Sequence, residues 1–356
     1  MGQVAGDTDP PPEVLAPRRL RRSLVALATV AVAVAAAIAV VPGVGELRRL
    51  FAGTRPGWIA LGAALEFASA LAYVVAFRRV FCAEMSWSTS YKIAMAELGA
   101  GALLPVGGAG GLALGAWALR RGGMPAGEIG RKTVAFFLVT SAPSVGLLIV
   151  LGVALGVGAV PGEVGPVAAL VPVAIAVAAV AGTLLLGRAS ARRVESYSRG
   201  ALGRVVAVLR ATASGVDDSV RLLRSRDAAL IAGIVGYLLF DILVLWTAFK
   251  ALGLGPPIAV IGIAFLIGQL GSLVPLPGGV GGVEGGLIGA LLIYGVDAAP
   301  ATAAVLLYRV IQLWIPAGFG AIAFIQLQRM LRAGVREIAL CSDDDSVVAV
   351  RRYKLV

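Results

Sequence analysis

The sequence predicts an all-α fold: a polytopic helical membrane protein with an inverted-topology repeat and two discontinuous or re-entrant helical segments. Composition supports this prediction, because 59% of the 356 residues are hydrophobic and only 14% are charged, whereas soluble domains carry about 25% charged residues. Apolar stretches longer than about 18 residues also recur, and each can cross a hydrocarbon core about 30 Å thick as a helix. Two of these stretches carry matching breaks rich in proline and glycine.

Composition also excludes several classes of function. The chain contains no histidine, which removes the usual proton shuttle, triad base and transition-metal ligand. It has no GxxxxGK[ST] phosphate-binding loop, and its net charge of +11 is typical of basic loops that orient a membrane protein rather than of nucleic-acid binding. Cys82 and Cys341 lack ligand-like neighbours, so neither a disulfide nor a zinc site is predicted. We expect no enzymatic activity, cofactor, metal or nucleic-acid partner.

The chain divides into a leader, a membrane domain and a tail. Residues 1–17 are polar and proline-rich, as is typical of a disordered cytoplasmic leader. Residues 18–328 form the predicted flippase-like transmembrane domain, and residues 329–356 a cytoplasmic tail. The membrane domain consists of a first half (57–187), a basic cytoplasmic connector (188–227) and a second half (228–328).

Uninterrupted apolar stretches are the predicted spans. The first is longer than the apolar core of a signal peptide, so we expect it to remain uncleaved. The connector carries apolar residues at helical spacing between Leu202 and Leu209, which indicates either an amphipathic helix on the membrane surface or a solvated basic linker. The spans are residues 23–41, 57–77, 133–160, 164–186, 228–251 and 299–327.

Two further apolar stretches are interrupted. Residues 90–119 contain the sequence PVGGAGG from Pro105, and residues 258–294 contain PLPGGVGG from Pro275. Proline removes a backbone donor and glycine weakens a helix interior, so both stretches should be discontinuous or re-entrant.

Loop charges predict the orientation, because cytoplasmic loops of membrane proteins are enriched in Lys and Arg. Both termini are therefore expected in the cytoplasm of a cell whose plasma membrane holds the protein. Arg48, Arg49 and Arg55 disagree with this arrangement, which places them outside. The first broken segment then leaves and returns on the cytoplasmic side, and the second on the exterior. The basic cytoplasmic ends are residues 18–22, 78–79, 120–132, 188–226 and 329–336.

An internal repeat links the two breaks. At an offset of 172 residues, Leu104-Pro105 aligns with Leu276-Pro277, and Ala76-Phe77-Arg78 aligns with Ala248-Phe249-Lys250. Inverted repeats with interrupted helices are typical of secondary transporters, whose binding site lies near the bilayer midplane. Interrupted backbone survives in a membrane only against protein or a water-lined cavity, and half-helix N-termini favour anions there.

Charged side chains in the apolar segments are candidates for that site, because they are costly in hydrocarbon and tend to face a cavity or a partner. Glu284 starts a returning half-helix and is suited to a cationic headgroup or a coupling proton. Arg309 offers a planar fork for phosphate, with the Tyr308 hydroxyl beside it. The alternative for each charged residue is a structural ion pair or a snorkelling group. The other charged residues of this kind are Glu66, Glu97 and Asp241.

The second half carries a recognisable series. PLPGGVGGVE at 275–284 is followed by Gly295, Leu307-Tyr308-Arg309, Trp314-Ile315-Pro316 and Gly320. This series resembles the flippase-like transmembrane domain of bacterial lysylphosphatidylglycerol synthases and their stand-alone relatives. The resemblance implies movement of a lipid or lipid-linked precursor between leaflets. Many relatives carry a GE…R series in the first repeat where this chain has GGAGGL, so headgroup preference does not transfer.

The resemblance also identifies members of a cavity motif, and these agree with the candidates found from charge and helix breaks. Only residues 329–356 follow the last span, so we expect no soluble aminoacyl-transfer domain and no lysyl-lipid synthesis. The predicted substrate-binding residues are Glu284, Arg309, Tyr308, Pro277, Gly278, Gly279, Gly281, Pro105, Glu97, Gln269, Glu66 and Asp241.

The predicted function is a plasma-membrane flippase or transporter that moves a lipid or lipid-linked precursor through a midplane cavity between inverted repeats. One alternative is a membrane-embedded enzyme that acts on polyprenyl-linked substrates. Another is a scaffold without transport activity, which would dock an envelope enzyme through its basic connector and acidic tail. The expected partner is a membrane lipid or lipid-linked substrate; a second copy of the chain and an envelope-biosynthesis enzyme remain open as further partners.

Overall fold

A computed structural model describes most of the membrane domain. It covers residues 45–103, 108–160, 165–193, 201–269 and 281–333, with the isolated positions 22, 25, 28, 29, 32, 33, 36, 271, 338 and 341. For residues 108, 109, 183–193 and 201–212 only the backbone is described. The predicted leader and most of the span at 23–41 and of the tail lie outside the described residues, as do Pro105, Pro277, Gly278 and Gly279.

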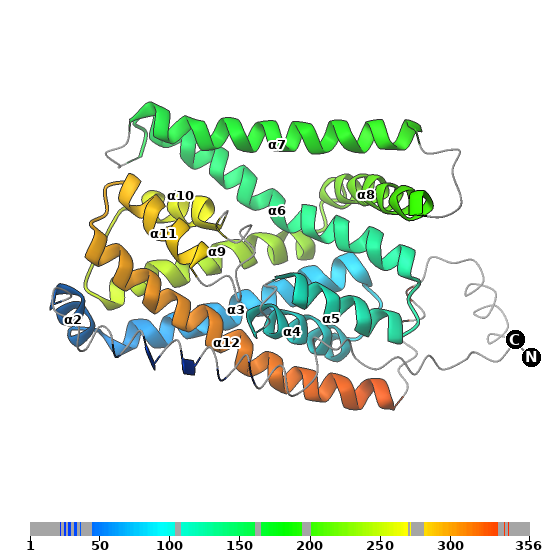
Figure 1. Cartoon of the computed structure of the whole chain (residues 1–356), viewed down its shortest axis with the longest axis horizontal. Helices are drawn as coiled ribbons and strands as arrows, with labels where there is room; N and C mark the ends of the chain where they lie inside the picture. The colour runs from blue at the N-terminus through cyan, green and yellow to red at the C-terminus, as the bar shows by residue number, and fades with distance from the viewer. Residues whose placement is uncertain are drawn as a thin grey trace, which may run out of the picture.

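Every regular element of the described part is a helix, as predicted (Figure 1). Four helices are long and apolar enough to cross a membrane, so the protein is a multi-pass membrane protein: α3 (Pro56–Phe81), α6 (Ala126–Gly156), α9 (Ala228–Ala251) and α12 (Ala298–Arg332). They correspond to four of the predicted spans. Helix α6 begins earlier than the predicted residue 133, because its first turns contain Arg131 and Lys132, which favour helix although they are not apolar.

Three other helices surround these spans. Helix α2 (Gly45–Ala52) lies at one end of the bundle, where Leu47 is buried. Helix α7 (Pro166–Arg193) covers residues 166–186 of the predicted span at 164–186 and continues into the predicted connector. Within the same connector, residues 201–224 form α8 (Ala201–Arg224), which packs against α6 and α7.

Both interrupted stretches form two helices, as predicted. The first gives α4 (Trp87–Leu103) and α5 (Gly108–Arg121), and the second gives α10 (Ile258–Gly268) and α11 (Gly282–Ile293). Figure 1 shows the pair α4 and α5 towards one end of the long axis and the pair α10 and α11 towards the other. The re-entrant path stays a prediction.

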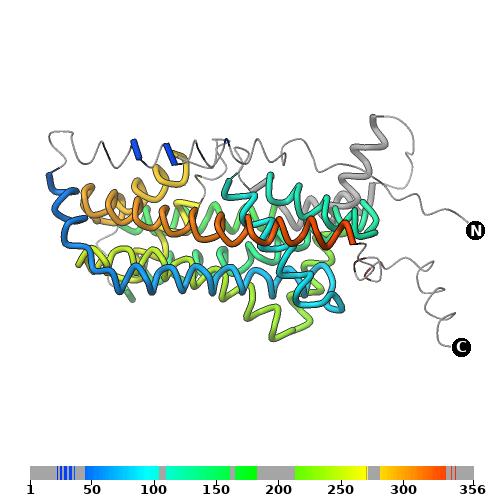
Figure 2. The backbone as a smooth tube through the Cα atoms, turned by 90° about the horizontal axis from the view of Figure 1, so that it is seen from below, coloured from blue at the N-terminus to red at the C-terminus, as the bar shows by residue number. Residues whose placement is uncertain are grey.

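Each pair of short helices belongs to its own hydrophobic core. One core includes Ile93 of α4 and Leu114 of α5; the other includes Phe265 of α10 and Leu287 of α11. The long helices α9 and α12 contribute to both cores, and α3 and α12 run side by side along the molecule (Figure 2). The two cores are therefore joined through the long helices.

Glycines allow the helices to approach closely where they cross. A Cβ at Gly233 of α9 would lie 2.9 Å from the backbone nitrogen of Ala76 in α3. A Cβ at Gly320 of α12 would lie 2.5 Å from the Cα of Gly99 in α4. Small residues at such crossings are the usual way in which membrane helices gain packing energy, since hydrocarbon supplies no hydrophobic drive between them.

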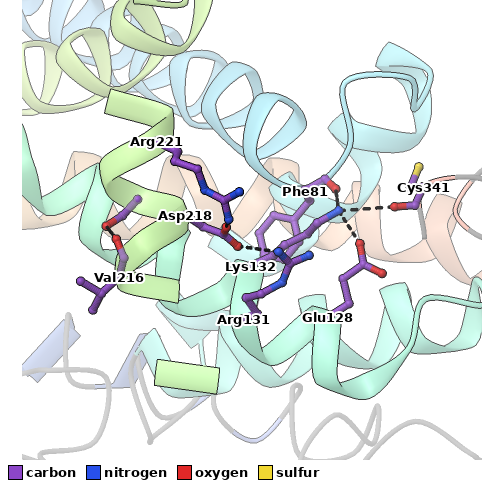
Figure 3. A network of polar contacts seen from close by, with 9 residues as sticks. Phe81, Glu128, Arg131, Lys132, Val216, Asp218, Arg221 and Cys341 are labelled. Carbon is purple, nitrogen blue, oxygen red and sulfur yellow. Dashed lines mark hydrogen bonds and ion pairs between the residues drawn. The ribbon is translucent and has the colours of Figure 1, made fainter. Parts of the chain in front are cut away.

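Polar contacts join the helix ends at which basic residues gather (Figure 3). Arg131 of α6 pairs with Asp218 of α8 at 2.9 Å. The Lys132 ammonium donates to the carbonyl of Phe81 at 2.8 Å and to that of Cys341 at 3.4 Å, and it pairs with Glu128 at 2.6 Å.

The prediction for the cysteines was wrong, because Cys82 and Cys341 form a disulfide with their Cα atoms 5.6 Å apart. Their separation of 259 residues in sequence gave no sign of this proximity. Ile338, close to Cys341 in the sequence, is fully buried against Gly122 at the end of α5. Ile338 and Cys341 thus contact the first half of the chain.

The contact between Gly99 and Gly320 can be tested by Gly320→Ala. The added methyl group would force α4 and α12 apart, so we expect the free energy of unfolding to fall by about 1–3 kcal/mol. Thermal unfolding of the purified protein in detergent measures this change. Gly318→Ala on the same helix is the matched control, since a Cβ there meets nothing within 4 Å; equal losses from both variants would contradict the close contact.

Asp227 provides a pH-dependent contact at the start of α9. Partial burial raises the pKa of Asp227, but hydrogen bonds from Arg79 and from the backbone N–H groups of Leu230 and Ala229 outweigh burial and hold its pKa below the ordinary value of 3.8. Its contribution to stability is therefore complete above pH 3.8 and is lost as the pH falls through the lower value of the folded state.

Asp227→Asn keeps a good N-cap and removes the charge. The difference in melting temperature between wild type and this variant should be largest at neutral pH and should shrink in acid. A difference that stays constant from pH 7 to below pH 3 would show that the Arg79 contact does not stabilise the folded state.

Candidate functional site

The centre of the candidate site is an ion pair between two predicted residues. Arg309 of α12 donates from Nε to Glu284 Oε1 of α11 at 2.7 Å. The side chains are only 9% and 17% exposed, so the two charges compensate each other where water has little access. Arg309 also donates from Nη1 to Gln312 Oε1 at 2.7 Å, one helical turn further along α12.

The start of α11 fixes the position of Glu284. Gly281 precedes the helix with a φ of +92°, a conformation that glycine adopts without steric cost. Its backbone N–H donates to Glu284 Oε2 at 2.7 Å. The carboxylate therefore lies at the helix N-terminus, as predicted, where the aligned backbone dipoles favour negative charge. The Gly281 turn and the Arg309 pair each use one of its oxygens.

Tyr308 lies in the hydrophobic core that includes α10 and α11. Its side chain is fully buried, and its ring lies edge-on to Phe265 with the ring centroids 6.1 Å apart. Its hydroxyl has no hydrogen-bond partner among the described residues. The hydroxyl thus makes no hydrogen bond to Arg309 in this conformation, and its role in binding stays a prediction.

A second polar cluster lies between α3 and α9. Glu66 and Asp241 are 4% and 7% exposed, and Asp241 Oδ1 lies 2.6 Å from the Ser69 hydroxyl. The same hydroxyl lies 3.1 Å from the carbonyl oxygen of Tyr237. Two of the predicted acids therefore meet across the crossing of α3 and α9.

Glu97 belongs to a third cluster, between α3 and α4. The Tyr73 hydroxyl donates to Glu97 Oε1 at 2.9 Å. Gly115 of α5 makes room for the other oxygen, because a Cβ at that position would lie 2.4 Å from Glu97 Oε2. The remaining described candidate, Gln269, follows the last turn of α10 and is half-buried.

Several residues of these clusters were not among the predicted ones. They are the uncharged partners of the acids and of Arg309. An uncharged polar side chain in an apolar segment does not stand out in the sequence as a charged one does, so these residues could not be identified in advance. One signal was available: Ser69 and Asp241 are 172 residues apart, which is the offset that aligns the two halves. The partners that sequence reasoning missed are Ser69, Tyr73, Tyr237 and Gln312.

The family model for the lysylphosphatidylglycerol synthase TM region matches residues 25–320. The chain belongs to this family. The match contains the residues of all three polar clusters, and the resemblance found in the series from Pro275 to Gly320 is confirmed. No curated protein and no solved structure matches the chain.

The ion pair at the site can be tested by a double-mutant cycle. Glu284→Gln and Arg309→Gln should each lower the free energy of unfolding by about 1.5–3 kcal/mol, since each leaves a poorly hydrated charge without its partner. The double variant should lose clearly less than the sum, because both charges are then gone. Chemical unfolding in detergent gives the four stabilities, and strictly additive losses would show that the pair does not interact.

Proposed function

We propose that this protein moves a lipid or lipid-linked precursor between the leaflets of the plasma membrane. The observation that carries the proposal is the Glu284–Arg309 pair, which places two opposite charges beside a break between two short helices in a membrane-spanning bundle. Charges in such a position are rare and usually mark a substrate or ion pathway. Membership of the lysylphosphatidylglycerol synthase TM region family supports a role that concerns lipids.

The order of the helices supports an inverted repeat. In each half a long helix is followed by two short helices and a second long helix. The equivalent helices begin at Pro56 and Ala228, and at Ala126 and Ala298, so they follow the offset that aligns the sequence. Helices α3 and α9 run in opposite directions (Figure 1), as inverted halves require. The breaks of both halves are then proposed to enter the membrane from opposite sides.

The ion pair suggests how a headgroup is held. A phosphate can compete for the Arg309 guanidinium, whose planar fork matches phosphate oxygens, while a cationic group can compete for Glu284. A headgroup with both charges would replace each partner of the pair by its own opposite charge. This exchange avoids leaving one charge alone in a poorly hydrated site, which is the main cost of opening a buried pair.

The basic residues support the proposed orientation. Arg78 and Arg79 end α3, Arg120 and Arg121 end α5, and the last turn of α12 is also basic. Figure 1 places these helix ends on the same side of the molecule. Cytoplasmic loops are enriched in such residues, so we assign this side and both termini to the cytoplasm, with a membrane lipid or lipid-linked substrate as the partner and no chemical conversion of it.

Leaflet exchange in reconstituted vesicles tests the proposal. The full chain is placed in vesicles of phosphatidylethanolamine and phosphatidylglycerol with a fluorescent phosphatidylglycerol as the probe. Vesicles with the wild-type protein should exchange the probe faster than protein-free vesicles. Glu284→Gln and Arg309→Gln should each slow the protein-dependent rate about tenfold or more. Such a decrease corresponds to the loss of one charged contact worth about 1.4 kcal/mol or more.

Arg332→Gln is the matched control, because Arg332 is an exposed arginine at the end of the same helix. It should keep the wild-type rate. Equal rates in wild type, Glu284→Gln and Arg309→Gln would refute the proposed roles, and a wild-type rate no higher than that of empty vesicles would refute exchange of this lipid.

A further inference from the structure

The acids Glu66 and Asp241 lie apart from the ion pair of the candidate site and at the boundary between the two hydrophobic cores. Leu65 belongs to the core of α10 and α11, and Phe67 to the core of α4 and α5. The two carboxyl groups lie close enough to repel each other. Within the described part of the chain, neither forms an ion pair with a basic residue. Because the two carboxyl groups are buried and repel each other when charged, ionising both of them costs more free energy than ionising one.

Two buried polar atoms in this region lack hydrogen-bond partners. They are Glu66 Oε2 and the Tyr308 hydroxyl oxygen, and their residues are 4% and 0% exposed. Tyr308 lies within electrostatic range of both acids. An unsatisfied buried polar atom costs free energy, so the site is incomplete until something supplies a hydrogen bond. A proton on one carboxyl supplies a donor and removes the repulsion at the same time.

Ser69 can adjust to either state of Asp241. Its hydroxyl has one hydrogen but lies within reach of two acceptors, Asp241 Oδ1 and the Tyr237 carbonyl oxygen. When Asp241 is ionised, Ser69 donates to the carboxylate. When Asp241 carries the proton, it can donate to Ser69, whose own hydrogen then turns to the Tyr237 carbonyl. A hydroxyl that rotates in this way satisfies both protonation states without movement of the backbone.

We propose that Glu66 and Asp241 share one exchangeable proton and form the site through which a proton gradient drives the protein. The coupling to transport rests on the proposed function, whereas proton binding does not. Glu66 and Asp241 lie where α3 crosses α9, between the two hydrophobic cores. Gain or loss of the proton therefore changes the charge at the boundary between these cores. The pair is distinct from Glu284 and Arg309, which are left to hold the headgroup.

The ionisable groups around the pair come from several helices. Tyr237 shares α9 with Asp241, and Tyr73 shares α3 with Glu66. Helix α12 contributes Tyr308 and, next to it, Arg309; α4 contributes Glu97. Helix α10 carries no ionisable residue, and those of α6 lie in its first two turns at the basic end of the molecule. The proton therefore belongs to the two acids. Their ionisable surroundings are the tyrosines, Glu97 and Arg309, and Arg309 is already paired with Glu284.

Infrared difference spectroscopy tests proton binding without transport. Spectra of the full-length protein in detergent, recorded across pH in H₂O and D₂O, should contain a carboxyl C=O band that disappears as the pH rises. The band should be lost in Glu66→Gln and in Asp241→Asn, because either change removes the sharing. Glu97→Gln, a buried acid with a separate tyrosine partner, is the matched control and should keep it. Ser69→Ala, which retains both acids, should move the transition to higher pH.

Three results would overturn the proton site. One is the absence of any pH-dependent band. Another is a band that only Glu97→Gln removes. The third is a band displaced by NaCl but not by KCl at constant pH, which would indicate a sodium site instead.

Leaflet exchange of the fluorescent phosphatidylglycerol under an imposed pH gradient tests the coupling. Wild type should be accelerated by the gradient and slowed by a protonophore, while Glu66→Gln and Asp241→Asn should lose this dependence. Glu128→Gln, which removes an acid that pairs with Lys132 away from the candidate site, should keep it. A gradient dependence that survives in both variants would overturn the coupling. If wild type moves no probe, the transport proposal fails, and the infrared result alone then decides whether the proton site stands.

Discussion

Polar groups inside a membrane-spanning bundle need partners from the protein itself, and this requirement governs how the helices of this chain are arranged. Arg309 finds Glu284, Glu97 finds Tyr73, and Asp241 finds Ser69, in each case on another helix. An unpaired charge at such a depth costs several kcal/mol. These pairs therefore constrain the positions of α3, α4, α9, α11 and α12 relative to one another, in addition to apolar packing.

Glycine makes these pairs reachable. Gly233 brings α9 against α3 near the Ser69–Asp241 contact, Gly99 and Gly320 bring α4 against α12, and Gly115 leaves space for the Glu97 carboxyl. A Cβ at any of these places would come within 3 Å of an atom on the facing helix, so that helix or side chain would have to move. The high glycine content of the chain, 47 residues, thus has a direct link to the chemistry of its interior.

Much of the fold could be predicted from the sequence because its signals are local. Long apolar stretches gave the four long helices, and the proline- and glycine-rich breaks gave the two pairs of short ones. The Glu284 position followed from the same break, since a helix that starts after glycine favours an acid in its first turn. The loop charges also predict that the two pairs enter the membrane from opposite sides, and this stays a prediction.

Contacts between distant parts of the chain could not be predicted, because they depend on the rotation and register of each helix. Tyr308 shows this most clearly: it directly precedes Arg309 in the sequence, yet it lies in a hydrophobic core while Arg309 reaches Glu284. Cys82 and Cys341 were judged independent because they are far apart in sequence, whereas the packing of Ile338 on Gly122 brings them together.

The bond between Cys82 and Cys341 has a mechanical consequence. It ties the segment that follows α12 to the turn between α3 and α4, and the Lys132 ammonium reinforces the junction by contacting carbonyls on both sides of it. The last helix of the second half is thus tethered to the first half at the basic end. Any rocking of one half against the other would have to use that end as its hinge, so the wider opening would occur at the opposite end, beside α2.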